Sequence, residues 1–201
     1  MTSESMRSVL RMSGMALQNR GRSVRRLVAA SVLEALGDAT ARTVGPLVAV
    51  SVLGAGTGVV GVLNAAGLVA FLLLGAPLGA AADRARPVGV MTAGSLVRAA
   101  AAAAGLVAWR AGRLEGSTGT ALLIALVLAV GVADVAYTTA RGALIPRLVD
   151  IAEVRDVYGR VQTASQAGGL IAPLALAGLL AVGAPPLAWV VTALAYLGSA
   201  A

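Results

Sequence analysis

The chain has 201 residues, of which 58% are hydrophobic and only 12% are charged, a balance outside the usual range of soluble domains. It contains no cysteine and no histidine, which excludes disulfides, thiolate chemistry and the common zinc sites. The formal net charge is +7, but aromatic residues make up only 3% of the chain, so the arginines have few stacking partners. We therefore expect no nucleic-acid partner, no cofactor and no bound metal. The chain also contains uncharged runs of roughly 20 residues, the length that crosses a hydrocarbon core, so we expect the lipid bilayer to be the partner of the apolar side chains.

Six apolar segments follow a polar beginning. Residues 1–23 are basic, and we expect a cytoplasmic tail rather than a cleaved signal peptide, because the next apolar run is long and carries charged residues. Residues 24–201 form the predicted transmembrane domain. Its predicted spans are about 26–53, 59–82, 88–109, 120–140, 161–182 and 187–201. The sixth offers roughly 22 Å of helix against a hydrocarbon core of about 30 Å, so we expect this helix to be truncated.

The arginines are distributed unequally between the two sides of the predicted bundle. One side holds twelve of the 16, in the tail, between the second and third spans, and around the loop between the fourth and fifth. The other side holds only Arg110 and Arg113. Basic residues collect in cytoplasmic loops. The sequence therefore predicts a multi-pass protein of the cell (inner or plasma) membrane with a cytoplasmic N-terminus.

Polar side chains inside the predicted spans are the first candidates for a functional site, because ionisable groups in a bilayer are costly unless they are paired or hydrated. Three of them follow one another at one-turn intervals in the first span, so they project from a similar side, and Asp38 and Arg42 can neutralise each other. These residues either carry substrate or protons, or form a buried ion-pair network that only orients the helices. The candidates are Glu34, Asp38, Arg42, Arg98, Asp134 and Gln166.

Two short motifs combine small residues with residues that fix helix geometry. Between the second and third spans, Gly79 precedes Asp83 and Arg84, and such a charged pair can cap one helix and hold it against a neighbour. In the fifth span, Gly168 precedes Ala172 and Pro173. Proline bends a helix, and small residues allow close packing in a membrane.

These segments resemble the major facilitator superfamily. The Gly-x-x-x-Asp-Arg pattern at 79–84 resembles motif A, which controls conformational change, although Pro87 follows where the family continues with basic residues. The pattern at 168–173 resembles motif C of antiporters, with alanine in place of the second glycine. Segments 28–38 and 144–162 are similar to the drug- and siderophore-exporting branch, which includes the enterobactin exporter and macrolide-efflux-like proteins.

The resemblance covers about residues 25–201 and implies both a fold and a function. The implied fold is an all-α membrane protein, the N-terminal six-helix half of a major-facilitator bundle, built as a 3+3 inverted repeat. The implied function is secondary active, proton-coupled export of drugs or siderophore-like small molecules. Because sites in this fold lie between two halves, we expect a C-terminal six-helix half as partner and no transport by this chain alone.

Two other functions remain open at this stage. The first is a chain that does not transport, either a truncated remnant or a packing and interaction subunit, and the second is an enzyme. A membrane-embedded phosphotransferase would need several aspartates around Asp-Gly-x-x-Ala-Arg, and the stretch from Asp38 to Arg42 is one residue short of that pattern. We therefore expect that the protein is not an enzyme.

The predicted orientation can be tested with single introduced cysteines, since the chain has none of its own. In intact cells a membrane-impermeant maleimide should label Ser117→Cys, because residues 110–118 are predicted to lie outside. It should label Arg86→Cys only after the cells are permeabilised. The opposite pattern would contradict the orientation inferred from the arginines.

Overall fold

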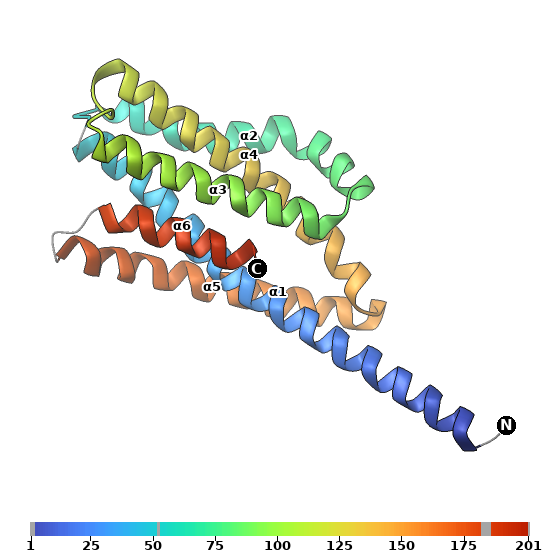
Figure 1. Ribbon diagram of the computed structural model, residues 1–201. Coiled ribbons are helices and arrows are strands. Elements are labelled where there is room, and N and C mark those ends of the chain that lie inside the picture. The colour runs from blue at the N-terminus through green and yellow to red at the C-terminus, as the bar shows by residue number, and fades with distance from the viewer. Residues whose placement is uncertain (1–2, 52, 182–185, 201) are drawn as a thin grey trace.

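Helices account for almost all of the described chain. The computed structural model describes residues 3–51, 53–181 and 186–200, and within these ranges it contains six α-helices and no β-strand (Figure 1). Side chains are described from residue 18 onward, except at positions 19, 67, 70, 82, 83, 180 and 181. The predicted all-α class is confirmed. The helices are α1 (Ser3–Ser51), α2 (Thr57–Arg84), α3 (Pro87–Arg110), α4 (Gly116–Leu148), α5 (Ile151–Ala181) and α6 (Pro186–Ala200).

Three of the described helices are long and apolar enough to cross a membrane. These candidate spans are Thr57–Ala81 in α2, Pro87–Arg110 in α3 and Gly116–Leu148 in α4. Helix α6 is apolar but has 15 residues, which is shorter than the roughly 20 needed to span a hydrocarbon core. Helix length and composition therefore support three of the six predicted spans within the described residues.

Several helices extend beyond the predicted spans. Helix α1 includes most of the predicted basic tail without a break and continues through Pro46. Helix α4 continues to Leu148 and α5 begins at Ile151, so most of the predicted loop at 141–160 is helical. Apolar composition marks the length of chain suited to lipid, whereas backbone hydrogen bonding propagates into polar sequence once a helix has formed.

The connection between α2 and α3 is shorter than predicted. Gly79, Asp83 and Arg84 belong to the last turns of α2 rather than to a loop, and the side chain of Asp83 is outside the described part of the chain. Only Ala85 and Arg86 separate the two helices. Helix α3 then starts at a proline, whose fixed φ suits the first helical position.

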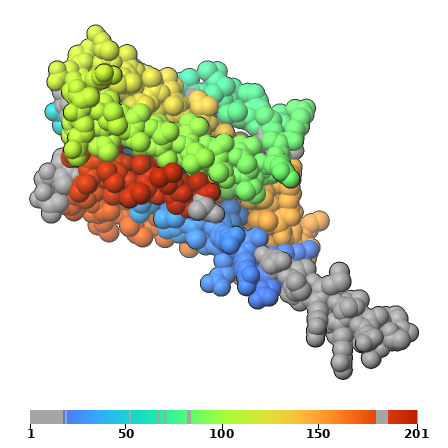
Figure 2. All heavy atoms as spheres, in the orientation of Figure 1, coloured from blue at the N-terminus to red at the C-terminus, as the bar shows by residue number. Residues whose placement is uncertain are grey.

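Five helix pairs make the extensive contacts of the bundle. Helix α1 packs on α5 and α6, α4 packs on α2 and α3, and α3 packs on α6. In Figure 2 one face of α6 is visible between α3 and the α1–α5 layer. If α1 is exchanged with α4, α2 with α5 and α3 with α6, the same five helix pairs result. The packing therefore has the pattern of two related three-helix units.

Buried apolar residues form two separate clusters along the bundle. The cluster nearer the N-terminal part of α1 includes Val24, Leu27, Met91, Ile145, Val157 and Val161. The other cluster includes Val44, Val48, Leu63, Leu123, Leu176 and Trp189. Residues 28–43 of α1 lie between them, as do residues 92–101 of α3. The interval contains the charged residues of α1 and α3 that the sequence analysis singled out.

Gly168 allows α5 to approach the backbone of α1. A Cβ added at this position would collide with the carbonyl oxygen of Val32 and would lie 3.1 Å from the Cβ of Ala35. The neighbouring Gly169 has no atom within 4 Å of the same added Cβ. Close packing of α1 on α5 therefore depends on one glycine and not on the other.

This difference predicts opposite outcomes for two adjacent substitutions. Gly168→Ala should destabilise the bundle by about 1–3 kcal/mol, because backbone atoms cannot move aside as a flexible side chain would. Gly169→Ala should be neutral or slightly stabilising, because alanine favours the helix. Thermal unfolding of both variants in detergent measures the effect. Equal midpoints would show that α1 and α5 do not approach this closely.

Candidate functional site

The centre of the site is Arg98 on α3, whose side chain is 0% exposed. Its Nη1 lies 3.0 Å from Oδ1 of Asp38 and 3.4 Å from Oε1 of Glu34, both on α1. The same nitrogen lies 3.5 Å from Oδ1 of Asp134 on α4. A single guanidinium nitrogen thus joins carboxylates of two helices to a third helix.

Two tyrosine rings enclose the same guanidinium. The Cζ of Arg98 lies 4.6 Å from the ring centroid of Tyr137 on α4 and 4.6 Å from that of Tyr196 on α6. These distances are within the range of cation–π attraction, which is stronger when the cation is desolvated. The hydroxyl of Tyr196 also donates to Oδ1 of Asp38 at 2.7 Å. Tyr196 can reach this position because a Cβ at Gly37 would lie 2.8 Å from its ring.

Two further arginines, Arg141 on α4 and Arg42 on α1, contact the carboxylates. Nη1 of Arg141 lies 2.9 Å from Oε2 of Glu34, and its side chain is 18% exposed. Nη2 of Arg42 lies 3.7 Å from Oδ2 of Asp38, and its side chain is 76% exposed. The ion cluster, defined here as Glu34, Asp38, Arg98, Asp134 and Arg141, therefore holds three carboxylates and two well-enclosed guanidiniums. Arg42 stands at its edge.

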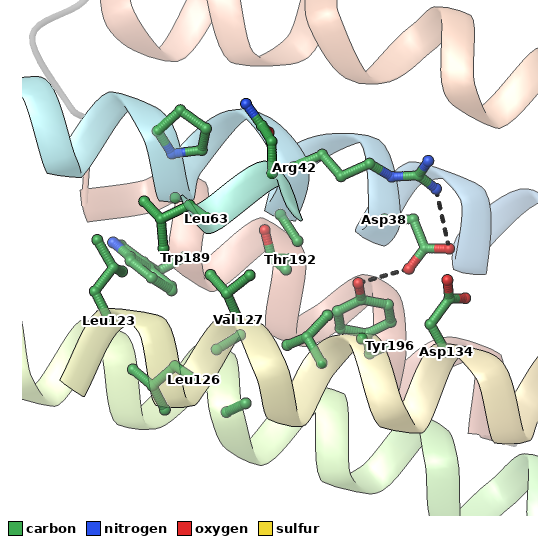
Figure 3. A pocket seen from close by; sticks show the side chains of 18 of the residues that line it. Asp38, Arg42, Leu63, Leu123, Leu126, Val127, Asp134, Trp189, Thr192 and Tyr196 are labelled. Atoms are coloured by element: carbon green, nitrogen blue, oxygen red, sulfur yellow. Dashed lines mark hydrogen bonds and ion pairs between the residues drawn. The ribbon is translucent and has the colours of Figure 1, made fainter. Parts of the chain in front are cut away.

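A cavity of about 380 Å³ begins at the ion cluster and extends between α1, α2, α3, α4 and α6. Figure 3 shows Asp38, Asp134 and Tyr196 close together at one end of it, with Arg42 beside Asp38. The remainder of the lining is mainly aliphatic and aromatic. Glu34 and Arg98 are not among the lining residues. The ion cluster thus has one side that faces the cavity and another that is enclosed by protein.

No family model matches the chain, and comparisons with curated proteins and with solved structures return no match. The resemblance to the major facilitator superfamily therefore stays a prediction.

Five of the six predicted candidates come together in space. Asp38 contacts both Arg42, as the helical spacing predicts, and Arg98, which lies nearer. Gln166 on α5 is exposed and lines neither this cavity nor the ion cluster. The three carboxylates have ligand atoms within 4.8 Å of one another, the spacing of a cation site, but Nη1 of Arg98 already contacts all three.

The two motif segments lie outside the ion cluster. Gly168 and Ala172 are buried on α5, and Pro173 on the same helix is exposed. Gly79 and Arg84 lie near the end of α2, and Arg84 donates to the carbonyl of Ala80 at 3.4 Å.

Three residues of the site, Tyr137, Arg141 and Tyr196, were not predicted from the sequence. Arg141 was assigned to a loop, although it follows Asp134 by seven residues, or two helical turns, and so lies on the same face of α4. Tyr137 lies on that face as well. For Tyr196 the sequence offers no signal, because its partner Asp38 is 158 residues away in the chain.

Removing the central guanidinium should strongly destabilise the protein. Arg98→Gln leaves the buried carboxylates of Glu34 and Asp38, and the partly exposed one of Asp134, around a neutral side chain. Breaking a buried ion pair in this way costs about 3–5 kcal/mol. Arg110→Gln, at the exposed end of the same helix, should change stability by less than about 0.5 kcal/mol. Thermal unfolding in detergent compares the two. If Arg98→Gln were as stable as Arg110→Gln, the carboxylates would not depend on Arg98.

Proposed function

We propose that the protein is one six-helix unit of a secondary active transporter that couples the export of a small molecule to proton movement. The observation that carries the proposal is the ion cluster, which is buried between two apolar clusters and opens on one side to a cavity. Ionisable groups placed this way inside apolar helices mark ion and substrate pathways.

Packing supports a transporter unit. The five helix pairs follow the pattern expected of two related three-helix units, the architecture predicted for one half of a major-facilitator bundle. The cluster joins both units, because Arg98 and Glu34 belong to the first and Asp134 and Arg141 to the second. Access in such folds alternates when one half rocks against another, so the proposed partner is a second six-helix half.

Exposed apolar side chains on α2 and α5 are consistent with a lipid or helical environment. On α2, Leu72 and Leu73 are each 69% exposed, and on α5, Leu170 and Leu174 are similarly exposed. The proposed location is the cell membrane, with the N-terminus in the cytoplasm. In support, the start of α1 and the α2–α3 and α4–α5 connections lie toward the same end of the bundle (Figure 1). Arg20 and Asp150 form an ion pair at that end, 3.0 Å apart.

The charges of the ion cluster suggest how a proton and a substrate compete for the same site. Arg98 and Arg141 balance two of the three carboxylates, and the third negative charge lies toward the cavity, where Asp38 and Asp134 are located. A proton, Arg42 or a ligand can neutralise that charge. When one of these replaces another, contacts between α1 and α4 change, and this links occupancy to helix position.

Proton release on ligand binding tests the proposal. The purified chain in weakly buffered detergent is titrated with a macrolide, a catecholate siderophore and tetraphenylphosphonium, while a pH indicator reports free protons. By linkage, at least one compound should release up to about one proton per bound molecule. Asp38→Asn, which removes a cavity-facing carboxylate but keeps its shape, should reduce this release.

Gln166→Ala is the matched control, because Gln166 is exposed outside the cluster and cavity. It should behave as the wild type. Binding without proton release at any pH would contradict coupling and favour a purely structural ion-pair network. The absence of binding by all three compounds would contradict the proposed transport of such molecules.

A further inference from the structure

The two enclosed arginines, Arg98 and Arg141, do not balance the formal negative charge of all three carboxylates in the ion cluster. Glu34 is held by Arg141 at 2.9 Å, and Asp38 by Arg98 at 3.0 Å. Among the described side chains, the ion-pair contact of Asp134 is the 3.5 Å one to the nitrogen that the other two carboxylates already share, and its side chain is 36% exposed. The unbalanced negative charge therefore lies at Asp38 and Asp134, and these are the two cluster carboxylates that line the cavity.

Arg42 supplies the missing positive charge, but it is held weakly. Its Nη2 is 3.7 Å from Asp38, at the long end of ion-pair distances, and 76% of its side chain is exposed. Asp38 itself is buried, but Arg42 is not, so water competes for its guanidinium and the long side chain loses conformational freedom in the pair, which keeps its contribution to stability small. Arg42 also lines the cavity. It can therefore move away from Asp38 into the cavity more easily than Arg98 or Arg141, whose side chains are more enclosed.

The rest of the cavity suits an apolar molecule. Its walls include Leu63, Phe71, Leu123, Val127 and Trp189, and its volume of about 380 Å³ falls within the range of small-molecule pockets. An occupant thus meets apolar side chains along most of its length and two carboxylates at one end (Figure 3). An anion at that end would face the unbalanced negative charge, whereas a cation would neutralise it.

We infer that Arg42 is a tethered counter-cation: it occupies the position at Asp38 and Asp134 that the positive group of a ligand takes. The ligand class is an organic cation with an apolar body. Binding exchanges Arg42, or a proton that has taken its place, for the ligand cation, so the guanidinium competes with the ligand rather than contacting it. This inference rests on the proposed function in that it treats the cavity as the substrate site.

Two probes of the same shape and opposite charge test the inference. Equilibrium binding of tetraphenylphosphonium and of tetraphenylborate is measured on the purified full chain in detergent. The wild type should bind the phosphonium more tightly than the borate. Arg42→Gln should strengthen phosphonium binding by about two- to five-fold, because it removes a weak competitor. Arg42→Lys should restore the wild-type affinity, because the competing charge returns.

Two further variants complete the experiment. Arg113→Gln removes an exposed arginine that does not line the cavity, and it should leave both affinities unchanged. Asp134→Asn should weaken phosphonium binding about tenfold or more, because a partly enclosed carboxylate that faces the cavity is lost. Should Asp134→Asn fail to fold, the gain of affinity in Arg42→Gln still tests the inference, since Arg42 is largely exposed and not needed for packing.

Unchanged or weaker phosphonium binding by Arg42→Gln would overturn the inference. Tighter binding of the borate by the wild type, lost in Arg42→Gln, would also overturn it and identify an anion site that uses Arg42 directly. These outcomes are separable from failure of the proposed function. Phosphonium binding that strengthens in Arg42→Gln without releasing protons supports the counter-cation and contradicts only the coupling.

Discussion

Arg98 is the group on which the arrangement of the helices depends. A fully buried guanidinium loses its hydration, which costs several kcal/mol unless charged and aromatic partners replace the water. Those partners come from α1, α4 and α6, while Arg98 itself comes from α3. If α1, α4 or α6 slid by one turn relative to α3, Arg98 would lose the partners that this helix supplies. Apolar side chains alone tolerate such slippage far better, so the ion cluster defines the register of the bundle.

Small residues make this central contact possible, and the apolar clusters protect it. Gly37 leaves room for Tyr196 beside Asp38, and Gly105 likewise leaves room for the ring of Trp189, since a Cβ there would collide with it. Apolar clusters on both sides separate the charged layer from the two ends of the bundle. The cavity opens on one side of this layer, where Asp38 and Asp134 line it and Glu34 does not. This asymmetry gives the carboxylates different surroundings although they share one guanidinium.

The sequence was sufficient to predict the helical class and most of the charged site. Charges such as Arg98 and Asp134 are conspicuous because they interrupt long apolar runs. The tyrosines are not conspicuous, because an aromatic residue in an apolar helix usually packs without any charged partner. Arg141 was missed because the apolar run ends before α4 does. Which helices meet depends on tertiary packing, so the spacing that paired Asp38 with Arg42 did not indicate the closer contact to Arg98.

The unbroken course of α1 has a mechanical consequence. Its 49 residues form one helix of about 74 Å, and its N-terminal part projects beyond the other helices (Figure 1). Asp38 lies roughly 52 Å along the helix axis from Ser3. A rigid tilt of only about 5° around the charged layer would therefore displace the basic end by roughly 4–5 Å. A small tilt of α1 at the carboxylates is thus amplified into a larger displacement of its N-terminal end outside the bundle.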